Sequence, residues 1–218
     1  MKAFPIAPWA LCARSLRLAS ALWAVLVLAL CSAWGADFTA KLAPLIDPAK
    51  LATLGQRGAN PRIQKAVAIL ADAQASGAKP AEVARQTVER AGYTGGAAGL
   101  TTAALLRNLD FAGKLGCLDA TNLAAMLRGN SPTVRAGPYA GQKAAVDHII
   151  PRAVVPALDN TIVNLELLPA KLNGAKSAKV GARQLDLARQ FHRAGLLDAA
   201  GLAAVERAAA GAKHWPLV

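Results

Sequence analysis

Cysteine, aromatic residues and acidic residues are all scarce in this 218-residue chain. Three cysteines exclude a disulfide-rich scaffold, and no pair of them is spaced like the ligands of a structural zinc site. Aromatic residues make up 5% of the chain against 54% hydrophobic residues, so any core has to be built from Ala, Leu and Val. Because Ala and Leu lose little free energy on entering a helix, this composition favours a mainly helical fold.

The shortage of acidic residues leaves the chain strongly basic. There are 25 Lys and Arg residues against 13 Asp and Glu residues, which gives a formal net charge of +12. A surplus of this size favours a polyanionic partner, which can be nucleic acid or an anionic membrane surface. Charge alone does not choose between these two partners.

The first 35 residues are typical of a secretory signal peptide. Basic residues up to Arg17 are followed by the apolar run Leu18–Leu30 and by small residues that predict cleavage after Gly35. The run is short for a membrane-spanning helix, so an uncleaved N-terminal anchor and a lipoprotein signal through Cys31 are weaker alternatives. Residues 1–35 hold three basic residues and no acidic one, so the mature chain keeps a net charge of +9. We therefore expect a periplasmic or secreted protein that is not inserted in the membrane after cleavage.

The mature chain divides into three stretches. Residues 36–130 have apolar positions at three- and four-residue spacings, separated by Gly and Pro, which predict a bundle of helices. Residues 131–180 are richer in Pro, Val and Ile, and the runs "AAVDHII" and "TIVNLELL" predict two short strands. Residues 181–218 return to a helical pattern. Because two strands bury too little apolar surface to stand alone, we expect residues 36–218 to form one cooperative domain.

Two local features of the helical stretch give further expectations. Cys117 is the one cysteine left after signal removal, and its apolar context "FAGKLGCLDA" predicts a buried thiol that acts as a small hydrophobic residue. Either Asp119 or Thr121 is expected to cap the helix in "DATNLAAMLRG".

Residues able to carry chemistry gather in residues 131–180. Asp147 and His148 are adjacent; Asn164 follows His148 by sixteen residues, and Asn173 comes nine residues later, where it is expected to open the helix "NGAKSAKV". Asp147 and the amide oxygen of Asn173 are hard oxygen ligands of the kind that Mg²⁺ accepts while keeping several waters. An imidazole titrates near neutral pH, so His148 can take a proton from an attacking water. These residue types suit the hydrolysis of a phosphodiester bond.

The order and spacing of "DHIIP" and "NLELLPAKLNGAKS" resemble the ββα-metal finger of HNH endonucleases, in the variant with Asn at the last position. The resemblance covers about residues 139–180, under a quarter of the mature chain. It implies two strands and a helix, with Asp147 and Asn173 at the metal and His148 as general base. It also implies that Asn164, on the second strand, holds either the loop or the His148 ring in orientation.

The function implied by this resemblance is an exported, metal-dependent endonuclease. Its cofactor would be Mg²⁺, with other divalent cations such as Mn²⁺ as alternatives, and its substrate nucleic acid, DNA rather than RNA. The absence of a recognisable base-reading module in the sequence favours low sequence specificity. The basic residues near the motif are expected to contact phosphates; these are Arg152, Lys171, Lys176 and Lys179.

Each of these residues also has a structural explanation. An Asp-His pair in an apolar strand is often a satisfied internal pair, Asn164 can belong to a turn, and Asn173 can cap a helix. Lysines on a helix are commonly a solvated face. The second hypothesis is therefore an exported, basic helical module that binds nucleic acid or an anionic envelope surface, with a non-catalytic finger.

Overall fold

The computed structural model describes residues 37–211. The predicted signal peptide, residues 1–35, and its cleavage point at Gly35 lie outside the described residues. Within residues 37–211, no helix is both long enough and apolar enough to cross a membrane. The chain divides into two units, Met1–Asp37 and Phe38–Val218, and the described residues from Phe38 on belong to the second.

Helices make up the first part of the unit, as the sequence predicts. After a helical segment at residues 37–46, the helices are α2 (Pro48–Ala52), α3 (Asn60–Ala75), α4 (Pro80–Arg90), α5 (Gly95–Lys114) and α6 (Ala120–Leu127). Proline stands at the start of α4, where its missing N–H costs nothing. Asp119, and not Thr121, caps α6, because its carboxylate accepts the Asn122 N–H at 3.0 Å.

The two strands of the described residues form one antiparallel hairpin. β1 (Ala144–His148) pairs with β2 (Leu165–Pro169), and the register places Asp147 opposite Glu166. The segment "TIVNLELL" is strand only in its second half, because Ile162–Asn164 forms a short 3₁₀ turn, η4. The expectation that Asn164 lies on the second strand is therefore wrong by one residue. The Asn164 side chain forms hydrogen bonds with the backbone of Ile150, in the loop after β1, and the regular pairing of β1 with β2 does not extend to Asn164.

Two further 3₁₀ turns and three helices complete the unit. The turns are η2 (Gly137–Tyr139) and η3 (Pro156–Leu158), and the helices are α7 (Ala170–Lys176), α8 (Ala182–Arg193) and α9 (Ala199–Ala210). The expectation that Asn173 opens a helix is wrong, because α7 begins at Ala170, directly after β2 ends at Pro169. Asn173 therefore lies in the middle of α7, on the same side as Lys176 one turn later.

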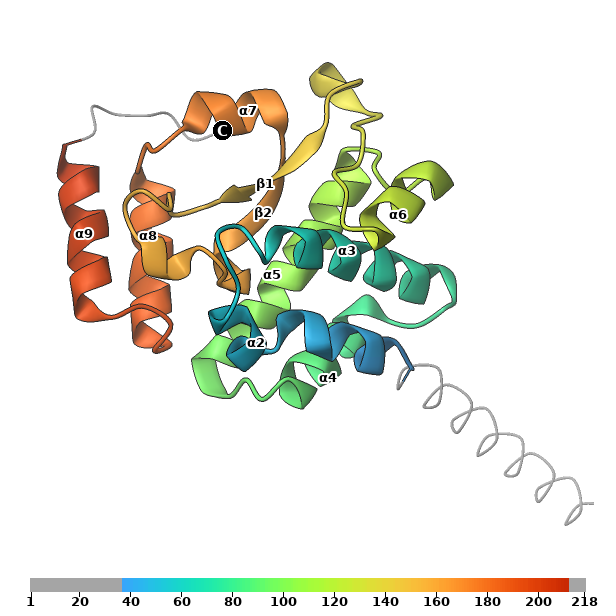
Figure 1. Ribbon diagram of the computed structural model, residues 1–218, viewed down its shortest axis with the longest axis horizontal. Helices are drawn as coiled ribbons and strands as arrows, with labels where there is room; N and C mark the ends of the chain where they lie inside the picture. The colour runs from blue at the N-terminus through green and yellow to red at the C-terminus, as the bar shows by residue number, and fades with distance from the viewer. Residues whose placement is uncertain (1–36, 212–218) are drawn as a thin grey trace, which may run out of the picture. The chain divides into compact units, whose positions relative to one another are not determined.

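The hairpin shares one hydrophobic core with the helices. Buried residues of α3 and α5, such as Leu70 and Leu105, belong to the same cluster as Val146 of β1 and Leu167 of β2. Figure 1 shows the hairpin between α5 and α7, with α8 and α9 side by side on its flank. The expected mainly helical fold with a small sheet is confirmed. This packing fixes the end of β1, where Asp147 and His148 lie.

Candidate active site

The end of β1 places Asp147 and His148 in a partly enclosed position. Their exposed fractions are 5% and 7%, although both side chains contribute to the wall of an open hollow of about 690 Å³. Arg152 and Asn173 line the same hollow, as do Arg57, Asn60 and Gln64. We call it the Asp147 hollow. Four residues selected from the sequence, two from the strand region and one each from the loop and α7, thus meet at one surface.

Lys176 neutralises the Asp147 carboxylate. The Lys176 Nζ lies 2.8 Å from Asp147 Oδ2 and donates a hydrogen bond to the His148 carbonyl oxygen at 2.6 Å. Burial raises the pKa of Asp147, and the ammonium of Lys176 works against that rise. Because these contacts turn Lys176 inward, with 12% of its side chain exposed, it is an internal counter-ion and does not occupy the outward position expected of a phosphate contact.

The imidazole of His148 is held from the loop between the strands. Its Nε2 lies 2.9 Å from the carbonyl oxygen of Asp159 and 2.8 Å from Oδ1 of the same residue. Asp159 was not selected from the sequence. The available signal was weak: it is the one acidic residue between the two strand runs.

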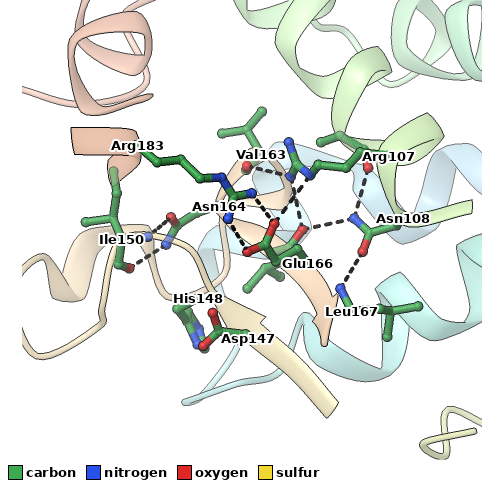
Figure 2. A network of polar contacts seen from close by, with 12 residues as sticks. Arg107, Asn108, Asp147, His148, Ile150, Val163, Asn164, Glu166, Leu167 and Arg183 are labelled. Atoms are coloured by element: carbon green, nitrogen blue, oxygen red, sulfur yellow. Dashed lines mark hydrogen bonds and ion pairs between the residues drawn. The ribbon is translucent and has the colours of Figure 1, made fainter. Parts of the chain in front are cut away.

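Asn164 fastens the loop that follows β1. It is fully buried; its Oδ1 accepts the Ile150 N–H at 2.8 Å, and its Nδ2 donates to the Ile150 carbonyl at 3.0 Å and the Leu158 carbonyl at 3.3 Å (Figure 2). Of the two roles that the HNH resemblance implies for this residue, these contacts match the holding of the loop. The contacts found for the His148 ring within residues 37–211 come from Asp159 instead.

The other basic residues selected from the sequence lie around the hollow in different ways. Arg152 lines it, with its Nε 3.9 Å from Asp159 Oδ1. Lys171 is exposed at the start of α7, and the Lys179 Nζ donates to the Ala175 carbonyl at 3.2 Å. Neither lysine lines the Asp147 hollow. Arg57, which sequence reasoning missed, does.

A second charged cluster surrounds Glu166, the residue of β2 that pairs with Asp147. Glu166 is fully buried and receives a bidentate ion pair from Arg183 of α8, while Arg107 of α5 approaches with its Nε 3.8 Å from Oε2 (Figure 2). Asn108 of α5 donates to the Leu165 carbonyl at 2.9 Å and accepts the Leu167 N–H at 2.8 Å. We call Glu166, Arg107, Arg183 and Asn108 the Glu166 cluster. The contacts of this cluster hold β2 against α5 and α8.

Few groups that could bind a metal gather at the site. Across the described part of the chain, no group of three or more His, Cys, Asp or Glu residues is arranged to hold a metal ion. Asp147 and Asn173 offer oxygen atoms, which do not suit a tight zinc site but suit Mg²⁺. Cys117 is not a candidate ligand or nucleophile, because it is fully buried, as expected, and burial raises the pKa of its thiol to about 11.

Comparison of the chain with models of protein families, with curated proteins and with solved structures finds no match. The functional argument therefore depends on the site itself.

Proposed function

We propose that the protein is an exported, metal-dependent endonuclease of the HNH type that hydrolyses phosphodiester bonds in nucleic acid. The observation that carries this proposal is the meeting of Asp147, His148, Arg152 and Asn173 in one open hollow. Asp147, His148 and Asn173 are the residues to which the HNH resemblance gives the metal and the base, and Arg152 is the basic residue that follows the Asp-His pair in the chain. A metal ligand pair, a base and a cation are the parts that phosphodiester hydrolysis requires.

Mg²⁺ fits the residues present. Asp147 is buried with its Oδ2 occupied by Lys176, so its second carboxylate oxygen and the amide oxygen of Asn173 would be the two protein ligands. Two ligands are enough for Mg²⁺, which keeps several waters and binds substrate phosphate. The chemistry that such an ion supplies when bound is charge neutralisation at the phosphate and at the departing oxygen.

His148 would act as the general base, with the nitrogen that does not contact Asp159. It takes a proton from the attacking water, whose oxygen forms a new bond to phosphorus while the bond to the departing sugar oxygen breaks. That sugar oxygen then takes a proton from the solvent. Arg57 and Arg152 are among the residues that line the hollow, and their guanidinium groups would hold the phosphate in place. Asn164 keeps the loop after β1 in position, as its three hydrogen bonds indicate.

The substrate would bind mainly through its backbone. Lys171 and Lys179 lie outside the Asp147 hollow, where a bound strand could continue beyond the cleaved phosphate. Contacts of this kind carry no sequence information, so we propose low sequence specificity. We propose DNA as the preferred substrate on the HNH resemblance. The signal-like pattern of residues 1–35 supports the proposal that the protein acts in the periplasm or outside the cell.

A digestion assay tests this function. Plasmid DNA and RNA are incubated with the full chain in Mg²⁺, in Mn²⁺ and in excess EDTA. We expect cleavage of plasmid with either cation and none with EDTA. Absence of cleavage in every divalent cation, from protein that is folded and binds DNA, would leave the nuclease proposal without support.

One observation favours the alternative function, a non-catalytic binding module. The Lys176 ammonium already neutralises Asp147, which is the one carboxylate available to a metal in the hollow. If this ion pair is permanent, the basic chain would bind nucleic acid or an anionic surface without cutting. The same assay separates the two functions, because a binder retards plasmid in a gel equally with Mg²⁺ and with EDTA and leaves it intact.

A further inference from the structure

Asp159 contacts the proposed general base, His148, and is placed to act on that residue and not on the substrate. It is 8% exposed, and its Oδ1 is 2.8 Å from the His148 Nε2. This Oδ1 has no hydrogen-bond partner of good geometry among the described residues, because the Nε2–H points to the carbonyl oxygen of the same residue. A buried carboxylate oxygen without a partner is costly unless a positive charge stands beside it.

The contacts of Asp159 determine which nitrogen of His148 carries the hydrogen. A backbone carbonyl can only accept a hydrogen bond, and the Asp159 carbonyl lies 2.9 Å from Nε2. The neutral ring must therefore carry its hydrogen on Nε2, which leaves the lone pair on Nδ1. When Nδ1 takes a proton, the ring becomes positively charged directly beside the Asp159 carboxylate.

The helical region of the chain holds Asp159 in this place. Its Oδ2 accepts the N–H of Arg57 at 3.0 Å, and Arg57 adopts a left-handed backbone with φ of 57°. The next residue, Asn160, accepts the Ala59 N–H at 3.0 Å. It also donates to the carbonyls of Leu54 and Gly55 at 3.2 and 3.1 Å.

Residues 54–59, between α2 and α3, therefore form a clasp around the loop that carries Asp159. A left-handed backbone at a non-glycine residue costs free energy, so the surrounding contacts must hold Arg57 in place. A clasp that only tied the loop down could do so through Asn160 alone. The additional bond from Arg57 fixes the orientation of the Asp159 carboxylate toward the ring.

We propose that Asp159 is the positioning residue of His148, which holds the ring with Nδ1 free and stabilises the imidazolium that forms during cleavage. The inference rests on the proposed nuclease function. The charged group that competes is Arg152, whose Nε is 3.9 Å from Asp159 Oδ1 and which partly neutralises the carboxylate. Arg152 is one-third exposed and the His148 side chain about one-tenth, so solvent screens the arginine more than the ring.

The test separates charge from shape. Asp159→Asn keeps an oxygen for the Arg57 N–H and removes the charge. We expect its kcat on plasmid at saturating Mg²⁺ to fall by about 10- to 100-fold, within the range that general-base catalysis contributes. KM and the urea midpoint should stay close to wild type. Asp110→Asn is the matched control, because it removes an exposed carboxylate paired with Lys114 on α5, and its kcat should be unchanged.

A second variant measures the purely structural contribution of the clasp. Asn160→Ala loosens the same loop and leaves the Asp159 charge in place. It should lower the urea midpoint more than Asp159→Asn does, yet reduce kcat less. Unchanged kcat in Asp159→Asn, or a loss that appears only in KM, would overturn the positioning role.

A spectroscopic measurement keeps this inference separate from the nuclease proposal. In the full chain labelled with ¹⁵N-histidine, the neutral His148 ring should show a protonated Nε2 and an unprotonated Nδ1. Asp159→Ala removes the carboxylate but keeps the backbone carbonyl, so the Nε2-protonated form should remain the major tautomer while becoming less dominant than in wild type. If wild-type protein does not cut nucleic acid but shows this single tautomer, the nuclease proposal fails while the positioning contact stands. A tautomer mixture in wild type would overturn the contact itself.

Discussion

Asp147 and Glu166 are direct partners in the hairpin, but the surroundings of their two carboxylates differ. Glu166 is fully buried, with Arg183 on both oxygens and Arg107 nearby. Asp147 has a single cationic partner, Lys176, and lines the Asp147 hollow. Both oxygens of Glu166 are therefore taken by Arg183, whereas one carboxylate oxygen of Asp147 remains available to a ligand.

The difference separates a structural role from a functional one. A buried ion pair stabilises only when its polar atoms are satisfied. Both carboxylate oxygens of Glu166 meet this condition, although the Arg107 Nε has no hydrogen-bond partner among the described residues. Burial raises the pKa of Asp147, which means that a charged carboxylate at this position costs folding free energy. Such a cost is typical of a site that another charge is meant to complete. We therefore expect changes at Asp147 and His148 to affect activity, and changes at Glu166 to affect stability.

The largest effect is expected from His148→Ala. Loss of the general base should lower the cleavage rate by about 10²- to 10⁴-fold. Metal and DNA binding should remain, because the ring is not a ligand in the proposed site. The rate is measured on plasmid at saturating Mg²⁺. His192→Ala on α8, whose ring contacts the Leu197 carbonyl, is the control and should cut at the wild-type rate. A His148→Ala protein with wild-type activity would remove His148 from the mechanism.

Glu166→Gln should give the largest loss of stability. It leaves the partly buried guanidinium groups of Arg107 and Arg183 without a counter-ion. Because solvent reaches both arginines, the loss in the free energy of unfolding should lie at or below the lower end of the about 3–5 kcal/mol typical of a fully buried pair. Urea unfolding measures this loss. Glu82→Gln, in an exposed pair with Arg85 on α4, is the control and should leave the urea midpoint nearly unchanged. A stability loss at Glu166 no larger than at Glu82 would break the contrast between the two carboxylates.

Asp147→Asn should reverse the pattern of Glu166→Gln. Because the raised pKa of Asp147 means that folding disfavours its charged form at neutral pH, removal of the charge relieves this cost. Lys176 loses its counter-ion in exchange, so the net change in stability should stay within about 1–2 kcal/mol. The half-saturating Mg²⁺ concentration for cleavage should rise at least about 10-fold, and Asn173→Ala should behave similarly. Mg²⁺ titrations that coincide with wild type would exclude both residues from the metal site.

The smallest effect is expected from Lys171→Ala. This exposed side chain lies beyond the Asp147 hollow and would contact one phosphate of a bound strand. Its loss should reduce the slope of log affinity against log salt by about 0.9. The cleavage rate at saturating DNA should not change. Binding is measured by fluorescence anisotropy between low and high salt. An unchanged slope would place the DNA path elsewhere.

Local patterns explain what could be predicted from the sequence. Apolar spacing, a first-turn proline and a capping aspartate predict α3, α4 and α6, because helices form through contacts three and four residues apart. The β-branched runs predict β1 and half of β2 for a similar reason. The boundary at Asn164 and the start of α7 were wrong because both depend on hydrogen bonds to distant segments.

The sequence by itself determined the helical class, the hairpin and the identity of Asp147, His148 and Asn173 as candidates. Only the tertiary structure decided that Lys176 turns inward onto Asp147, and that Asp159 faces the ring of His148. The physical reason is distance along the chain. The Arg57 N–H reaches Asp159 across 102 residues, and Arg183 reaches Glu166 across 17. No local period records such contacts, because a charged side chain finds its partner only after the core has packed.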